Sequence, residues 1–240
     1  MPGYLVKQEL IAVTGVDDLV IRSLLDRQQF SDPQGAASRA GISSASWPLF
    51  GLLWPSGAQL AARLALRPVT ANERILEIGC GLALASLVAH RRGADVTASD
   101  NHPLAASFLA ENLRLNGLAP MKYRHGDWAA DQRAPAGAGD TPLACPVHGD
   151  FDLVIGSDLL YERDENGDLA SFIDRHCAPR CEVWIVDPDR GNRSAFSRRM
   201  ASAGFALREE RLDTPPVLGL PDAGAYKGRL LLYSRTRRSP

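Results

Sequence analysis

Short apolar runs and longer amphipathic stretches alternate along the chain from residue 74 onward. The short runs predict five strands, at residues 74–78, 95–99, 121–125, 151–157 and 181–186. In the longer stretches, apolar side chains recur with helical spacing and predict four helices, at residues 82–92, 103–116, 169–177 and 193–203. Alternation of strands and helices favours a largely parallel sheet covered by helices on both faces.

Glycine and proline residues agree with these boundaries. Gly93 and Gly117 follow the first two helices, and Pro103 lies near the first turn of the second. The run at 151–157 is almost continuously apolar, as in a strand that is buried on both faces. By contrast, Ala, Pro and Gly crowd residues 131–149, which predicts an exposed loop.

Two further strand candidates, at residues 206–211 and 228–234, end the pattern with no helix between them. They predict an antiparallel pair of strands that is added to the sheet. The fold class expected from the whole pattern is a three-layer α/β sandwich, with a mostly parallel seven-stranded sheet and an antiparallel last strand.

The first fifty residues carry a weaker pattern. Weak strand candidates lie at residues 4–13 and 20–25, and a polar stretch rich in Gly, Ser and Ala continues up to Ser46. A helix is then predicted at residues 55–66, with proline at its first position. We expect an N-terminal extension and one domain, at residues 1–50 and 51–240.

The composition is that of an ordinary globular protein, since 45% of the 240 residues are hydrophobic and 23% are charged. The formal net charge of −1 gives no reason to expect nucleic acid or an anionic membrane as a partner. The sequence shows neither the roughly 18 consecutive apolar residues of a membrane span nor a targeting pattern at its start. We therefore expect a cytoplasmic protein.

The cysteines and histidines show no spacing typical of a metal or nucleophile site. Cys177 and Cys181 lie four residues apart beside His176, but zinc sites usually need a second pair of ligands. The five histidines are scattered, with no arrangement that suggests nucleophilic catalysis. We predict no metal site. The Arg-rich end of the chain, including Arg235, is expected to be solvated and frayed.

The strongest chemical signal is a Gly-x-Gly turn between the first strand of the alternating pattern and its helix. Gly79 and Gly81 let the backbone pass close to a ligand, because glycine has no Cβ. Asp100 ends the next strand 21 residues after Gly79, where an acidic side chain can accept both hydroxyl hydrogens of a ribose. The pattern therefore predicts a cofactor that contains a nucleoside.

Two cofactor classes use this arrangement. A dinucleotide fingerprint needs a third glycine, where this chain has Leu84. Glu77, two residues before the first glycine, would repel a diphosphate but suits a cofactor that carries an amino group. Both observations favour S-adenosylmethionine. A dinucleotide-binding oxidoreductase and a purely structural tight turn remain as alternatives.

The segment from Glu77 to Asn116 resembles the first two motifs of class I, Rossmann-like methyltransferases. The flanking segments are similar to the seven-strand protein lysine methyltransferases often called family 16. The matches are the aromatic W-P segment at residues 50–57, the pair Asp127-Trp128, and a D-x-x-Y motif within Ser157-Asp158-Leu159-Leu160-Tyr161. The chain departs from the family at Ala83, where a third glycine is common. The loop Asp187-Pro188-Asp189-Arg190 resembles, more loosely, members that methylate electron-transfer flavoprotein.

The resemblance implies a role for each matched residue. Those implied to bind S-adenosylmethionine are Trp54, Glu77, Gly79, Gly81, Asp100, Asn101, Asp127, Trp128 and Ser157. Among them, Asp100 and Asn101 would bind the ribose hydroxyls, Asp127 would accept from the adenine amino group, and Trp128 would cover the ring. The alternative for Trp54 is a core residue, and the alternative for Asp127 and Trp128 is a surface turn with a half-buried indole.

Asp158 and Tyr161 are the implied catalytic residues, beyond the carboxyl edge of the fourth strand. Methyl transfer needs an in-line approach by a neutral nucleophile, so positioning and desolvation are the main contributions of an enzyme. Asp158 would orient a lysine amine, and Tyr161 would line the channel that admits it. The alternative for Asp158 is a helix N-cap. Enzymes that methylate planar amino groups typically carry N-P-P-Y here, so a flexible amine suits this chain better.

We therefore expect an S-adenosylmethionine-dependent N-methyltransferase whose partner is a protein that presents a lysine side chain. Neither nucleic acid nor a membrane is expected as a partner. A small-molecule N- or O-methyltransferase is the alternative within catalysis, because the fold and the cofactor do not determine the acceptor. A non-catalytic module that keeps the cofactor fold is the alternative from another class.

Overall fold

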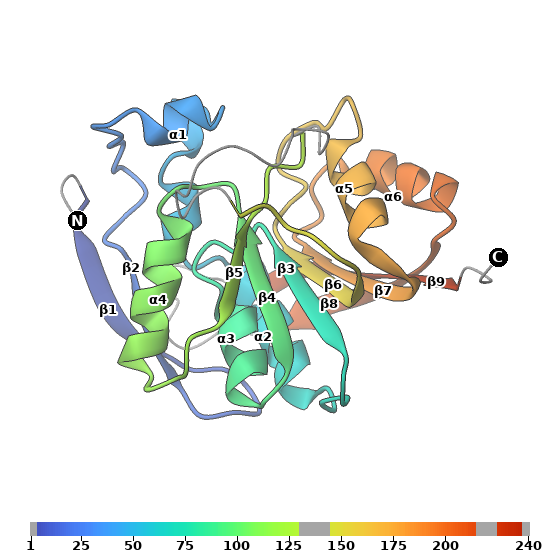
Figure 1. Cartoon of the computed structure of the whole chain (residues 1–240), viewed down its shortest axis with the longest axis horizontal. Coiled ribbons are helices and arrows are strands. Elements are labelled where there is room, and N and C mark those ends of the chain that lie inside the picture. Colours follow the sequence, from blue (N-terminus) through green and yellow to red (C-terminus); the bar gives the residue numbers. More distant parts are fainter. Residues whose placement is uncertain (1–3, 130–144, 215–224, 237–240) are drawn as a thin grey trace.

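The computed structural model describes residues 4–129, 145–214 and 225–236. Within them, seven strands form one sheet in the order β5-β4-β3-β6-β7-β9-β8. The strands are β3 (Arg74–Ile78), β4 (Asp95–Asp100), β5 (Lys122–His125), β6 (Phe151–Ser157), β7 (Cys177–Asp187), β8 (Ala206–Thr214) and β9 (Tyr226–Thr236). Neighbouring strands from β5 to β7 are parallel, whereas β9 is antiparallel to both β7 and β8. The predicted sheet is confirmed (Figure 1).

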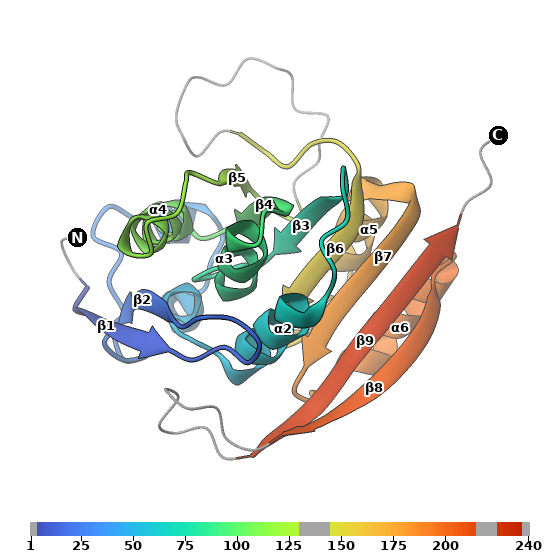
Figure 2. The same ribbon diagram turned by 90° about the horizontal axis from the view of Figure 1, so that it is seen from below.

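Helices cover both faces of this sheet and complete the three-layer sandwich (Figure 2). One face carries α2 (Pro55–Leu66), α3 (Leu84–Arg91) and α4 (Ala105–Leu115), and the other carries α5 (Asp168–His176) and α6 (Arg193–Ser202). All five agree with the predicted helices to within two residues at each end. Each face has its own cluster of buried apolar side chains. No helix in the described ranges has the length and apolar character needed to cross a membrane.

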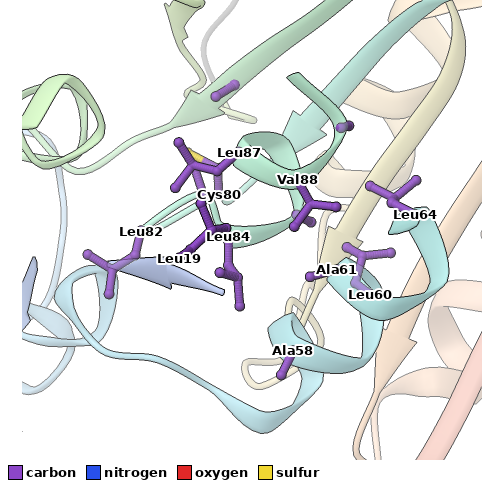
Figure 3. Packing of buried hydrophobic residues seen from close by; sticks show 14 of the residues in the cluster. Leu19, Ala58, Leu60, Ala61, Leu64, Cys80, Leu82, Leu84, Leu87 and Val88 are labelled. Carbon is purple, nitrogen blue, oxygen red and sulfur yellow. The ribbon is translucent and has the colours of Figure 1, made fainter. Parts of the chain in front are cut away.

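The helices α2 and α3 pack against each other on one face of the sheet. Their contact is built from buried aliphatic side chains, Leu60 and Leu64 of α2 and Leu87 and Val88 of α3 (Figure 3). Leu19 joins the same cluster from an N-terminal strand. Because α3 follows the glycine turn directly, this packing fixes the turn against the edge of the sheet.

A separate two-stranded antiparallel sheet precedes these layers, formed by β1 (Val6–Ile11) and β2 (Leu19–Leu24). Two amides extend its hydrogen bonding, one on α4 and one at the C-cap that follows it: the Oδ1 atoms of Asn112 and Asn116 accept from the backbone N–H groups of Arg22 and Val20, each over 2.8 Å. These two side chains thereby cover the free edge of β2, which would otherwise expose unpaired backbone groups. The short helices α1 (Ala36–Arg39), η1 (Ser44–Ser46) and η2 (Leu49–Gly51) lead from this sheet to α2.

Strand β7 begins at Cys177, four residues earlier than predicted. Phe151 of β6 pairs with Cys177, but Leu153 pairs with Glu182, so β7 carries extra residues in an irregular register. The apolar pattern missed this bulge because residues 177–181 contain a proline and an arginine and show no alternation.

The expectation of a frayed end is wrong for Arg235. This residue lies within β9 and is 5% exposed. Its guanidinium pairs with Asp174 of α5 and lies over the ring of Phe205, 4.2 Å from the ring centroid. Sequence patterning could not show this, because the acidic partner lies 61 positions away in the chain.

Most of the loop predicted at residues 131–149 lies outside the described residues. Its last part runs beside β5, where the N–H of His125 donates to the carbonyl of Cys145 over 2.9 Å. The N–H of Val147 in turn donates to the carbonyl of His125 over 3.1 Å. Among the described residues of this loop, Cys145, Pro146, His148 and Gly149 are exposed as expected, whereas Val147 is buried, with 2% exposure.

Candidate active site

The carboxyl ends of β3, β4 and β6 meet at one edge of the sheet, where the strand order reverses between β3 and β6. Parallel sheets bind ligands at such switch points. A cavity of about 560 Å³ opens there. Its lining includes every residue that the sequence singled out, namely Trp54, Glu77, Gly79, Gly81, Asp100, Asn101, Asp127, Trp128, Ser157, Asp158 and Tyr161. The structure brings these residues together, and their individual roles stay predictions.

The glycine turn forms the floor of the cavity beyond β3. Gly79 and Gly81 both have positive φ, 57° and 52°. A Cβ on Gly81 would lie 2.8 Å from the carbonyl oxygen of Phe50, and a Cβ on Gly79 would lie 2.6 Å from the Leu159 side chain. The close approach of Phe50 to Gly81, and of Leu159 to Gly79, therefore favours glycine at both positions. Ala83 has a φ of 58°, so alanine here adopts a conformation that favours glycine.

The Glu77 carboxylate ties β3 to the first turn of α3. Its Oε2 accepts the backbone N–H of Ser86 over 2.9 Å, and the Ser86 hydroxyl also donates to it. Glu77 is 3% exposed, and burial raises its pKa to about 7, against the lowering effect of the Ser86 hydrogen bonds. A cation entering the cavity would stabilise the ionised form of this side chain.

Asp100 and Asn101 end β4 beside the glycine turn. The two carboxylate oxygens of Asp100 accept backbone N–H groups of Gly81 and His102, each over 2.8 Å. Burial raises the pKa of Asp100, and these backbone hydrogen bonds lower it. The Asn101 amide nitrogen donates to the carbonyl of Ala40 over 3.2 Å, while its buried Oδ1 has no hydrogen-bond partner among the described residues.

Two tryptophans lie on the cavity wall. The indole N–H of Trp54 donates to the carbonyl of Leu49 over 2.9 Å, which fixes the ring just before α2. The Trp128 ring lies near the glycine turn, 3.6 Å from where a Cβ on Gly79 would be. Beside it, the Oδ1 of Asp127 accepts the backbone N–H of Ala129 over 3.0 Å. Both rings present flat apolar surface at the cavity.

Asp158 follows β6 with a φ of 60°, and its N–H donates to the carbonyl of Val186 over 2.9 Å. Its side chain is 11% exposed and pairs with Arg190 at 2.8 Å. Burial raises the pKa of Asp158, while Arg190 and a hydrogen bond from Ser56 lower it. Tyr161, 42% exposed, lies among the lining residues.

The alternative role of Asp158 as a helix N-cap is wrong. The helix that follows, α5, begins ten residues later at Asp168, and its N-cap residue is Gly167. The Asp164 carboxylate accepts the N–H groups of Gly167 and Asp168 over 2.8 and 2.9 Å. Asp158 is therefore available to the cavity.

Several lining residues were given no site role from the sequence, although Phe50, Leu53 and Arg190 lie in segments that resemble the family. One group lies on the segment before α2 and the other at and after the end of β7; they are Ile42, Leu49, Phe50, Leu53, Arg190, Asn192 and Phe196. The segment before α2 has no regular periodicity that indicates its place in the fold. His102 is buried and stacks on Phe50 at 3.7 Å between ring centroids. Among the described residues, no cluster of His, Cys, Asp and Glu could hold a metal ion.

The residues present fit S-adenosylmethionine. The unpartnered Oδ1 of Asn101 and the carboxylate of Asp100 supply acceptors for hydroxyl groups on one side of the glycine turn. Glu77 supplies negative charge on the floor for an amino group, and the Trp128 ring supplies a face for a base. Because Gly79 and Gly81 have no Cβ, the glycine turn leaves space for such a ligand to approach the backbone.

A family model described as lysine methyltransferase matches residues 51–202, which include β3 through α6 and the whole glycine turn. Curated relatives agree with it. The electron transfer flavoprotein beta subunit lysine methyltransferase of Danio rerio is 38% identical over 147 residues, 60% of this chain and 51% of that protein. Protein N-lysine methyltransferase METTL21A of Danio rerio is 28% identical over 155 residues, 63% of this chain and 67% of that protein.

The match to the first of these relatives spans about half of that protein's length. Among solved structures, a TehB-like SAM-dependent methyltransferase from Corynebacterium glutamicum superposes with a TM-score of 0.51 at 17% identity, covering 84% of this chain and 92% of that one. This likeness supports the methyltransferase fold. With the family model matching more than half of the residues, the chain belongs to the lysine methyltransferase family.

Proposed function

We propose that this chain transfers a methyl group from S-adenosylmethionine to the side-chain nitrogen of a lysine in a protein substrate. The observation that carries the proposal is the buried carboxylate of Asp158, which lies in the same cavity as the glycine turn and Asp100. A carboxylate at that place suits an amine that arrives as an ammonium ion. The names of the relatives support a protein lysine as acceptor.

The cofactor supplies an electrophilic methyl group on a sulfonium centre when it is bound. Asp100 and Asn101 would hold its ribose, Asp127 and Trp128 its adenine, and Glu77 its amino end. The glycine turn and Trp54 would hold the methionine part. Together these side chains exclude water from the place where the methyl group is held.

Asp158 and Tyr161 act on the acceptor. Asp158 attracts the lysine ammonium and orients its nitrogen, and the ammonium gives a proton to solvent water before the neutral amine attacks. Tyr161 lines the entrance with an aromatic surface that suits the aliphatic part of a lysine side chain. Neither residue needs to act as a strong base, because positioning and desolvation are the main requirements of this reaction.

Two measurements test this function. Calorimetric titration with S-adenosylmethionine should show binding, and its absence would remove the basis of the proposal. Methyl-labelled cofactor should then transfer label to the protein fraction of a cell extract and not to a protein-depleted extract. Label only in the protein-depleted extract would support the small-molecule alternative, and binding without any transfer would support the non-catalytic one.

A further inference from the structure

An ion pair occupies the acceptor end of the cavity. The guanidinium of Arg190 lies 2.8 Å from the carboxylate of Asp158, and both residues line the cavity. The Asp158 side chain is 11% exposed and that of Arg190 is 40% exposed. The arginine is therefore the more exposed partner of the pair, in the cavity that a substrate amine would have to enter.

The backbone of Arg190 is held independently of this pair. Its N–H donates to the Oδ2 of Asp187, a residue with 0% exposure, over 3.0 Å. The neighbouring Asp189 accepts from Arg229 over 2.9 Å and pairs with Arg193 at 3.0 Å. These contacts hold the backbone of the loop through groups other than Asp158.

The other groups that face Asp158 supply no positive charge. Ser56 of α2 donates a hydrogen bond to it from the buried side, and the hydroxyls of Ser56 and Tyr226 lie 3.1 Å apart. Burial raises the pKa of Tyr226 to about 12, so this group is neutral. Tyr161 and Asp187 also face Asp158, and each is neutral or negative. Within the described residues, Arg190 is the cation paired with Asp158.

We propose that Arg190 is a positioning residue that keeps Asp158 ionised and directed at the cavity, and that the substrate ammonium replaces its guanidinium on that carboxylate. This inference rests on the proposed function, since it takes an amine as the acceptor. A buried carboxylate without a partner takes up a proton, and a neutral Asp158 would not attract an ammonium ion. Exchange of one cation for another avoids leaving the carboxylate buried and unpaired.

NMR titration of the side-chain carboxyl carbons in the purified protein tests whether Arg190 keeps Asp158 ionised. This measurement does not require enzymatic activity. The Asp158 signal is assigned by comparison with Asp158→Asn. The pKa of Asp158 should be higher in Arg190→Gln than in the wild-type protein, and Arg190→Lys should restore it, because lysine keeps the charge. Arg208→Gln removes the same charge from β8, where Arg208 is exposed, and should change nothing. An unchanged pKa in Arg190→Gln would overturn the proposal.

Titration with n-butylammonium tests whether an ammonium ion replaces the Arg190 guanidinium on Asp158. It is carried out at a pH where Asp158 is ionised in all variants. This probe should shift the Asp158 signal and bind several-fold more tightly to Arg190→Gln than to Arg190→Lys, because the competing cation is absent. Equal or weaker binding to Arg190→Gln would contradict the replacement.

The pH dependence of kcat/KM tests whether the ionisation of Asp158 and its exchange of cations affect catalysis. Ionisation of the substrate amine affects all variants alike, so it cancels in the ratio to the wild-type protein. Arg190→Gln should lose about tenfold more activity at pH 6 than at pH 9, and Arg190→Lys should follow the wild-type profile. A loss that is equal at all pH values would indicate a merely structural role. If the wild-type protein methylates nothing while the NMR shifts appear, the proposed function fails and the role of Arg190 toward Asp158 stands.

Discussion

The carboxylate of Asp100 accepts a hydrogen bond from the backbone N–H of Gly81, 2.8 Å away. This bond joins the end of β4 to the turn after β3 and closes the floor of the cavity. The other carboxylate oxygen accepts from His102, so both oxygens are held in place before any ligand binds. A fixed acceptor loses little conformational entropy on binding, which favours affinity.

Replacement of Asp100 by Asn should weaken binding of S-adenosylmethionine by about tenfold to a hundredfold, because hydrogen bonds to a charged group contribute about 1.5–3 kcal/mol. Calorimetric titration measures the change. Asp95→Asn is the matched control at the exposed start of the same strand, where Asp95 pairs with Lys122, and it should bind like the wild-type protein. Equal affinities in all three proteins would remove Asp100 from the cofactor site.

Gly81→Ala should destabilise the fold by about 1–3 kcal/mol more than Gly117→Ala, measured by urea unfolding. Both glycines have similar positive φ, 52° and 62°, so the backbone cost is shared. They differ in surroundings, since a Cβ on Gly81 would meet the Phe50 carbonyl at 2.8 Å while Gly117 has nothing within 4 Å. If the two variants were equally stable, the contact between a Cβ at position 81 and the Phe50 carbonyl would not contribute to the free energy of unfolding.

The buried Glu77 should make stability depend on pH. Its folded pKa of about 7 exceeds its ordinary value of 4.5, so the folded state keeps the proton after the unfolded state has released it. The stabilising contribution is therefore complete below pH 4.5 and is lost as the pH rises through 7. Over this window the free energy of unfolding of the wild-type protein should fall by roughly 3 kcal/mol relative to Glu77→Gln. A difference that stays constant from pH 4.5 to 8 would show that burial does not shift the pKa of this side chain.

The sequence predicted the sheet well because strands and helices depend on local patterns, and it predicted residues of the cavity through the glycine turn and the family resemblance. Apolar runs followed by a glycine turn identify β3, and parallel strands carry their carboxyl ends to one edge, so the side chains of Asp100 and Asp158 meet there. The interactions that were missed join distant positions. Arg235 of β9 pairs with Asp174 of α5, and Arg190, after β7, pairs with Asp158, after β6. Neither ion pair produces a periodic pattern in the sequence.

The N-terminal segment shows the same limit. The carbonyl of Ala40 accepts from Asn101, and the carbonyl of Phe50 lies close to Gly81, so residues before α2 contribute to the cavity. The sequence indicated this for the segment at residues 50–57 through its resemblance to the family, but not for Ala40. The division at residue 50 into an extension and a domain stays a prediction, as does the cytoplasmic location. Long-range contacts of this kind depend on the whole fold and cannot be inferred from spacing.

The most direct test of the proposed function is the chemical identity of the methylated residue. Purified protein is incubated with methyl-labelled S-adenosylmethionine and the protein fraction of a cell extract, which is then hydrolysed to amino acids and separated by chromatography. We expect the label in methylated lysine, with incorporation about a hundredfold lower for Asp158→Asn, because that variant no longer orients the amine. Label in another amino acid, or equal incorporation by Asp158→Asn, would contradict the proposed function.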